Sequence, residues 1–188
     1  MGLANWLTVF RIILIPVFVT LLVYRRPTAA LMVFLLASLT DTLDGYFARR
    51  RGNQTRLGAF LDPMADKLLL TASFITLTYL KVVPFWITAV VISRDLVLIL
   101  GAALIHIAGG TIQPAPTWLG KASTFFQMLT VLAAMVMVYL FKTPWAAKPF
   151  FWITAAFTTA SGIQYLYKGT RLLNPPSPRD PHAPTLAR

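Results

Sequence analysis

The sequence contains no cysteine and only two histidines, His106 and His182, among its 188 residues. Without cysteine the chain can form no disulfide, carry no thiol nucleophile and bind no metal through sulfur. Two histidines are too few for a histidine-built metal site. Charged residues are also scarce, at 12% of the chain, against about 25% in soluble domains. Such a chain cannot cover a water-facing surface with polar groups, and we expect an integral membrane protein.

Acidic residues are the scarcest charged class, with 6 Asp or Glu against 17 Lys or Arg. The resulting net charge of +11 would suit nucleic acid. The basic residues, however, flank apolar runs, a placement that favours anionic lipid headgroups. We therefore expect membrane lipids as partners and no nucleic acid.

Apolar runs of about 20 residues, the length that crosses a bilayer, predict an all-α protein with about six transmembrane helices. Residues 1–168 are expected to form a single transmembrane domain, and residues 169–188 a proline-rich, disordered tail in the cytoplasm. The predicted spans are residues 6–24, 29–48, 59–80, 85–107, 118–141 and 150–167.

The basic residues between the spans predict the orientation of the chain. With six spans, both termini and the loops at 49–58 and 108–117 share one side, which carries eight Lys or Arg. The opposite side carries five, namely Arg25, Arg26, Lys81, Lys142 and Lys148. This bias favours both termini in the cytoplasm.

Five of the six acids fall inside predicted spans or their terminal turns: Asp41, Asp44, Asp62, Asp66 and Asp95. A carboxylate in hydrocarbon is costly, so each indicates a functional site by default. The first two are three residues apart and the next two are four apart, so each pair shares one helical face. Because the second and third spans are antiparallel neighbours, both pairs are expected to converge near the cytoplasmic surface.

Four adjacent carboxylates repel one another unless cations lie among them. Oxygen ligands without Cys or His suit Mg²⁺, Mn²⁺ or Ca²⁺. Four carboxylates can hold two such ions, an arrangement that serves phosphoryl transfer. The alternative is that Arg49, Arg50 and Lys67 neutralise the acids as ion pairs within the membrane.

Small residues lie among the acids. Gly45 and Ala48 share the face of the first pair to within a turn, and Gly58 precedes the second pair. Small side chains beside a metal cluster let a bulky ligand approach the backbone. They equally mediate close packing of helices in lipid.

Together these residues resemble the signature of the CDP-alcohol phosphotransferase family, D-x2-D-G-x2-A-R-x8-G-x3-D-x3-D. Every fixed position of the signature is present between Asp41 and Asp66. The resemblance covers most of residues 5–168. It continues in Asn5 to Arg11 with Pro16, in Ser93-Arg94-Asp95, in Gly120-Lys121 with Gln127, and in Ser161-Gly162 with Tyr165.

The resemblance implies a six-helix enzyme of bacterial inner-membrane type, usually a homodimer, with its active site facing the cytosol. In such an enzyme an acceptor hydroxyl displaces CMP from a CDP-linked lipid such as CDP-diacylglycerol. Asp66 would be the general base. Two Mg²⁺ or Mn²⁺ ions would be ligated by Asp41, Asp44, Asp62 and Asp66. The CDP-binding residues would be Gly45, Ala48, Arg49, Gly58, Asn5 and Thr8.

The candidate acceptor-binding residues are Arg94, Lys121 and Lys67, which could hold an anionic acceptor. Lys121 could instead extend to the membrane interface, and Arg94 could pair with its neighbour Asp95. Phosphatidylglycerophosphate synthases usually carry a second arginine eight residues after the first, where this chain has Ala102. The segment 157–161 resembles CMP-forming cardiolipin synthases. Glycerol 3-phosphate and phosphatidylglycerol therefore both stay open as acceptors, ahead of inositol phosphate, serine and choline.

If the family signature is set aside, the acidic residues are compatible with two other classes of function. A cation channel or transporter would use the acidic cluster as an ion site and would not turn over CDP-lipid. A structural or partner-binding membrane protein would tolerate Asp→Asn changes without loss of any activity.

Overall fold

A computed structural model describes the backbone of residues 3–51, 56–107 and 117–173, and the side chains of residues 9–40, 65–101, 103 and 117–167. Within these ranges the chain is helical and has no β-strand, which confirms the all-α prediction. A π-helix, Val136–Leu140, continues the fifth helix, and a 3-10 turn, Pro144–Ala147, precedes the sixth. The α-helices are α1 (Leu3–Val23), α2 (Pro27–Arg51), α3 (Arg56–Tyr79), α4 (Phe85–Ile107), α5 (Trp118–Met135) and α6 (Lys148–Leu173).

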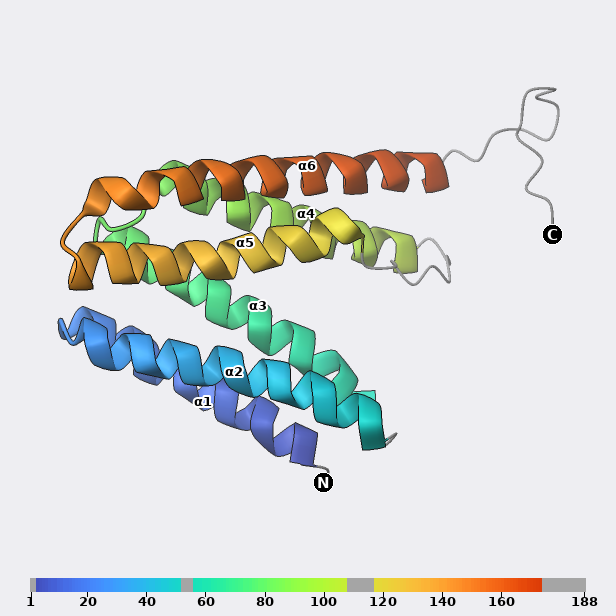
Figure 1. Ribbon diagram of the computed structural model, residues 1–188. Helices are drawn as coiled ribbons and strands as arrows, with labels where there is room; N and C mark the ends of the chain where they lie inside the picture. Colours follow the sequence, from blue (N-terminus) through green and yellow to red (C-terminus); the bar gives the residue numbers. More distant parts are fainter. Residues whose placement is uncertain (1–2, 52–55, 108–116, 174–188) are drawn as a thin grey trace, which may run out of the picture.

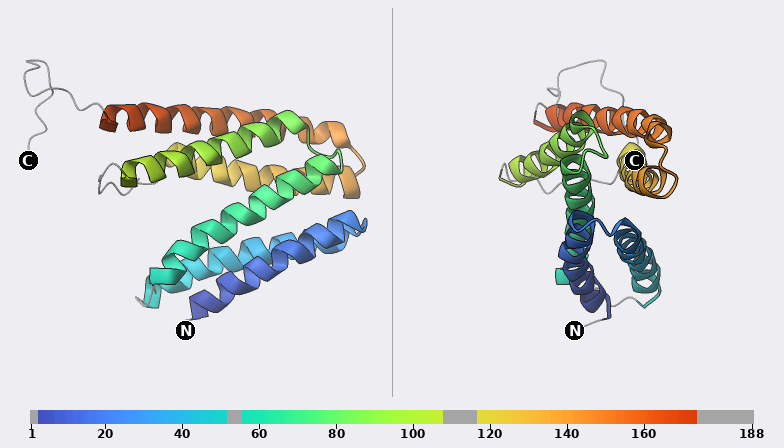
Figure 2. Two further views of the ribbon diagram at one scale, coloured as in Figure 1. Left: turned by 180° about the vertical axis from the view of Figure 1, so that it is seen from behind. Right: turned by 90° about the vertical axis from the view of Figure 1, so that its left-hand side faces the viewer.

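The helices run back and forth along one direction, so that alternate connections lie at opposite ends of the bundle (Figure 1). Helices α1, α2 and α3 form one half, in which α1 packs against both α2 and α3. In the other half α6 packs against α4 and α5. Helix α3 also contacts α4 and α5, and it therefore joins the two halves, as both views in Figure 2 show.

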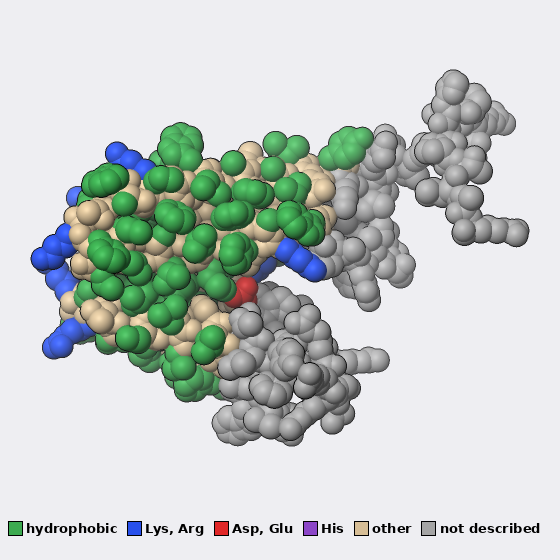
Figure 3. All heavy atoms as spheres, in the orientation of Figure 1, with side chains coloured by type: hydrophobic (Ala, Val, Ile, Leu, Met, Phe, Trp, Pro, Cys, Tyr) green, Lys and Arg blue, Asp and Glu red, His purple; other side chains and the backbone are tan. Residues whose placement is uncertain are grey.

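Large apolar side chains cover the outside of the bundle along the length of the helices (Figure 3). Leu39, Ile75, Leu100 and Phe125, from four different helices, are each more than half exposed. Soluble monomers rarely expose contiguous apolar surface on this scale. Among the described residues one helical segment, Trp118–Leu140, is long and apolar enough by itself to cross a membrane. An apolar outer surface is expected of a protein embedded in lipid, and the six membrane spans stay a prediction.

The interface between α5 and α6, by contrast, contains a series of side-chain hydrogen bonds. Thr130 and Thr154 share a hydrogen bond of 2.6 Å between their hydroxyls, and Ser123 and Thr158 share one of 3.0 Å. Gln127 donates to both Ser123 and Thr158 at 3.3 Å. In lipid such side-chain bonds contribute about 0.6 kcal/mol each on average. They fix the register of α6 on α5.

Two helices continue beyond their predicted C-terminal ends. Helix α2 continues to Arg51, so the basic residues assigned to the start of a loop are helical. Helix α6 continues to Leu173, so residues 169–173, assigned to the tail, are helical too, and residues 174–188 lie outside the described ranges. Arginine and lysine are good helix formers, and positive charge in the last turn of a helix interacts favourably with its dipole. Basic residues after an apolar run therefore extended these helices rather than ending them.

Candidate functional site

The family signature occupies the end of α2 and the beginning of α3. Asp41 and Asp44 belong to α2, and Asp62 and Asp66 belong to α3. Both helix ends lie at the same end of the bundle, joined through residues 52–55 (Figure 1). The side chains of Asp41, Asp44 and Asp62 lie outside the described residues. Their convergence into one cluster therefore stays a prediction.

The six predicted CDP-binding residues lie on helices that reach this same end. Their backbones are helical, but their side chains lie outside the described residues, so their roles stay predictions. They are Asn5 and Thr8 in α1, Gly45, Ala48 and Arg49 in α2, and Gly58 in α3.

Asp66 is the one signature carboxylate whose surroundings are described. It is half-buried on α3, directly after Ala65, which is fully buried. The described side chains contain no group of three or more His, Asp or Glu residues able to hold a metal. Because Asp66 alone of the predicted set is among them, that observation does not test the predicted cluster.

A second charged cluster lies where α3 meets α4. The Lys67 Nζ of α3 lies 3.3 Å from the Asp95 Oδ1 of α4. The Arg94 Nη1 donates to the same oxygen at 2.8 Å. One carboxylate thus holds two of the three predicted acceptor-binding cations together. Figure 3 shows an acidic side chain close to basic ones between the two halves of the bundle.

Arg94 is enclosed by helices from the second half of the bundle. Its side chain is 6% exposed, and its Nη2 donates to Ser161 Oγ of α6 at 3.0 Å. A Cβ added to Gly120 would lie 3.4 Å from Nη2, and one added to Gly162 would lie 3.6 Å from Arg94 Cγ. Small residues in α5 and α6 therefore allow both helices to pack closely around this guanidinium.

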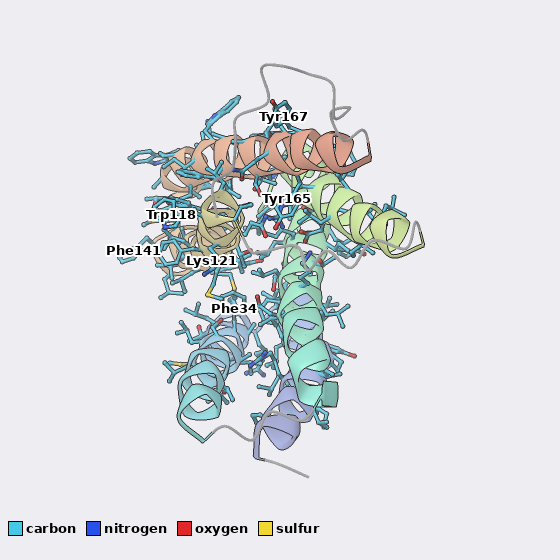
Figure 4. The ribbon with its side chains drawn as sticks, turned by 90° about the vertical axis from the view of Figure 1, so that its right-hand side faces the viewer. Phe34, Trp118, Lys121, Phe141, Tyr165 and Tyr167 are labelled. Carbon is cyan, nitrogen blue, oxygen red and sulfur yellow. The ribbon has the colours of Figure 1, made fainter. Side chains whose placement is uncertain are left out.

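Lys121 lies apart from this cluster, in the first turn of α5. Thr117 caps that helix by accepting a hydrogen bond of 3.1 Å from Gly120 N. Figure 4 looks onto this end of the bundle and shows Lys121 on α5 and Tyr165 on α6. The Lys121 side chain is exposed and forms no ion pair with a described acid. This position agrees with a lysine that extends to the membrane interface.

Asp95 and Ser161, which both contact Arg94, were not among the site residues predicted from the sequence. The sequence analysis gave the pairing of Arg94 with Asp95 as an alternative, and this pairing is confirmed. Asp95 also binds Lys67. The sequence had offered the signature acids as ion-pair partners of Lys67. Ser161 was recognised as part of the resemblance, without a partner. For Asp95 the available signal was an acid inside an apolar span. For Ser161 it was a Ser-Gly pair that begins three residues after Thr158 in α6.

Binding of an anion by the charged cluster stays a prediction, which its net charge favours. Lys67 and Arg94 together carry two positive charges against the single negative charge of Asp95, so the cluster has a surplus of one positive charge. Lys67 follows Asp66 directly in α3.

Comparison with known proteins identifies related sequences. The family model described as CDP-alcohol phosphatidyltransferase matches residues 1–160. The CDP-diacylglycerol–glycerol-3-phosphate 3-phosphatidyltransferase of Bacillus subtilis is 35% identical over 92% of this chain and 97% of its own length. The Haemophilus influenzae protein of that name is 37% identical over 90% and 95%. Human cardiolipin synthase (CMP-forming) is 34% identical over 89% of this chain, which spans 61% of the human protein.

Proposed function

The chain belongs to the CDP-alcohol phosphatidyltransferase family, and from this premise we propose how its residues divide the reaction. It is a CDP-diacylglycerol-dependent phosphatidyltransferase of phospholipid synthesis that uses a glycerol-type acceptor. The acceptor oxygen forms a bond to the phosphatidyl phosphorus, the bond from that phosphorus to the CMP phosphate breaks, and CMP leaves. The complete signature between Asp41 and Asp66 carries this conclusion.

We assign the proton transfer to Asp66. A carboxylate within hydrogen-bond reach of the acceptor hydroxyl can take its proton as the new bond forms. The chain contains no cysteine and its sequence offers no Ser-His pairing, so direct displacement is favoured over a covalent intermediate. In this assignment Asn5, Thr8, Gly45, Ala48, Arg49 and Gly58 hold the CDP group.

The donor set of the signature fits divalent metal ions. All four candidate ligands, Asp41, Asp44, Asp62 and Asp66, are carboxylates, which suit Mg²⁺ or Mn²⁺. The helical spacing places each pair on one face of its helix, and both helix ends lie at one end of the bundle. Bound there, two such ions would neutralise the charge of the pyrophosphate.

For the acceptor we propose phosphatidylglycerol. The site provides one buried guanidinium, Arg94, whose two terminal nitrogens already bind Asp95 and Ser161. Ala102 occupies the position in α4 where a second arginine would help to bind a dianion. A phosphodiester carries a single negative charge and needs fewer charge-assisted bonds than a phosphomonoester. Glycerol 3-phosphate is the second candidate, because the names of the bacterial relatives specify it.

The acceptor can be tested with purified protein, CDP-diacylglycerol and each acceptor in turn, with CMP release as the measurement. We expect turnover with phosphatidylglycerol and poor use of glycerol 3-phosphate. The Ala102→Arg variant should raise the use of glycerol 3-phosphate roughly tenfold or more, which is the scale of one added charge-assisted hydrogen bond. Efficient use of glycerol 3-phosphate by the unmodified protein, with no product from phosphatidylglycerol, would contradict the proposal.

The Arg94→Ala variant tests the acceptor site, and Lys121→Ala is its matched control. Loss of the buried Arg94 should raise the acceptor KM and leave the binding of CDP-diacylglycerol nearly intact. Loss of the exposed Lys121 should have the smaller effect, because it lies outside the charged cluster. An Arg94→Ala protein that lost CDP-diacylglycerol binding instead would remove Arg94 from the acceptor site.

We further propose that all six α-helices cross a bacterial inner membrane, with the signature and both termini in the cytoplasm, and that the enzyme is a homodimer. The apolar outer surface supports the membrane embedding, and the family is membrane-associated. The charge bias of eight against five supports the orientation. A reporter fused after Arg188 should be active only in the cytoplasm. A periplasmic signal would separate the signature from its nucleotide substrate and reject this orientation.

A further inference from the structure

The end of the bundle opposite the signature carries an uncompensated positive charge. Its three connections and their flanks contain five exposed basic residues: Arg25, Arg26, Lys81, Lys142 and Lys148. Figure 3 shows Lys and Arg side chains gathered at this end. The sequence has no Asp or Glu in residues 1–40, 67–94 or 96–179. The connections thus contain no acid of their own, which leaves their basic residues available to an anionic partner.

The three connections share a backbone feature, which falls on a basic residue in each. Arg25, Lys81 and Lys142 each follow a helix and have positive φ angles of 56°, 59° and 54°. Glycine is the residue that most easily adopts this conformation at a helix end, and non-glycine residues adopt it uncommonly. All three connections at this end thus have a cation where glycine would be easier to accommodate.

A pocket of about 400 Å³ opens between the α3–α4 connection and the beginning of α6. Two ammonium groups lie at its rim, because both Lys81 and Lys148 line it and both are exposed. Val83 and Phe151, which also line it, are only 2% and 5% exposed. The pocket therefore combines a cationic rim with an apolar floor, which suits an amphipathic anion rather than a small hydrophilic one.

Exposed aromatic rings place this pocket at the level of the membrane interface. Phe85 lines the pocket and is 76% exposed, and Trp145 and Trp152 are each 69% exposed. The ring centroids of Trp86 in α4 and Trp152 in α6 lie 5.0 Å apart. Tryptophan and tyrosine gather at the headgroup level of membrane proteins, and lysine side chains extend to the same level. In the membrane embedding proposed above, the pocket would lie at the depth of lipid phosphates.

We propose that this pocket binds the phosphate of an anionic phospholipid through Lys81 and Lys148, in the leaflet opposite the candidate active site. The apolar floor contacts the glycerol and the first acyl carbons of the lipid. Inorganic phosphate is also an anion, but it has no apolar group to contact the floor of the pocket. A zwitterionic lipid would bring its own cation toward the basic rim. The proposal depends on the membrane embedding of the chain and not on the reaction or its acceptor.

The test measures binding of phosphatidylserine, an anionic lipid outside the glycerol-type acceptors, to the purified full-length protein in detergent by native mass spectrometry. We expect one retained lipid per chain, and at least a roughly tenfold loss of affinity in the double variant Lys81→Gln/Lys148→Gln, the scale of losing charge-assisted bonds. The matched control is Arg26→Gln/Lys142→Gln, which removes the same charge from the same end but spares the pocket. Its loss should be much smaller, and CMP release should be unchanged in both variants.

Three results would overturn the proposal. The unmodified protein could retain no phosphatidylserine, or the two double variants could lose it equally, which would indicate general attraction to a basic surface. Inorganic phosphate could displace the lipid, which would indicate a site for free phosphate. If the pocket variant fails to fold, Lys148→Gln alone makes the same test, because Lys148 is exposed at the first residue of α6.

Discussion

Removal of divalent cations with excess EDTA is expected to abolish CMP release, and added Mg²⁺ or Mn²⁺ should restore it. The four carboxylates that we predict to cluster at one end of α2 and α3 would repel one another without cations among them. The pyrophosphate of the substrate adds further negative charge to the same place. The expected loss exceeds roughly a hundredfold, because metal neutralisation of developing charge is worth several kcal/mol. CMP release is measured with CDP-diacylglycerol and phosphatidylglycerol before and after the metal is returned.

The thermal unfolding of the protein in EDTA provides the control for this experiment. Packing of α1 on α2 and α3 does not depend on the signature side chains alone, since a buried apolar cluster that includes Phe18 and Phe34 joins the helices. The protein should therefore stay folded while it is inactive. Full turnover in excess EDTA would reject the two-metal site.

The Asp66→Asn variant is expected to lose at least ~10²-fold in kcat, the scale of a general-base contribution. Asparagine keeps the size of the side chain and removes its ability to accept the proton of the acceptor hydroxyl. The measurement is kcat for CMP release with both substrates saturating. Near-normal turnover would show that another group takes the proton.

Asp95→Asn is the matched control, because it removes the other described carboxylate at this end of the bundle. Asp95 binds Lys67 and Arg94, so its loss should disturb the positions of two cations and raise the acceptor KM. It should affect kcat less than Asp66→Asn does. Equal losses of kcat in both variants would assign the effect to general disruption of charge rather than to a base at Asp66.

The helices themselves were largely predictable, because apolar runs and their polar interruptions are local features of the sequence. The fourth span was predicted at residues 85–107, and α4 has those bounds. Errors arose where basic residues follow an apolar run, at the end of α2 and of α6. The change from α-helix to π-helix at Val136 was not predicted. The hydrophobicity pattern does not distinguish i→i+4 from i→i+5 hydrogen bonding.

By itself the sequence determined the family and its chemistry. The signature depends on residues three and four apart within helices, and helical geometry alone places such residues on one face. The tertiary structure decided which charges meet. Lys67, Arg94 and Asp95 come from α3 and α4, and Ser161 comes from α6, 67 positions after Arg94. The Arg94–Asp95 pair joins sequence neighbours, but only the packing of the helices brings Lys67 to Asp95 and Ser161 to Arg94, because a charge in a low-dielectric interior must bind whatever polar groups the neighbouring helices bring within reach.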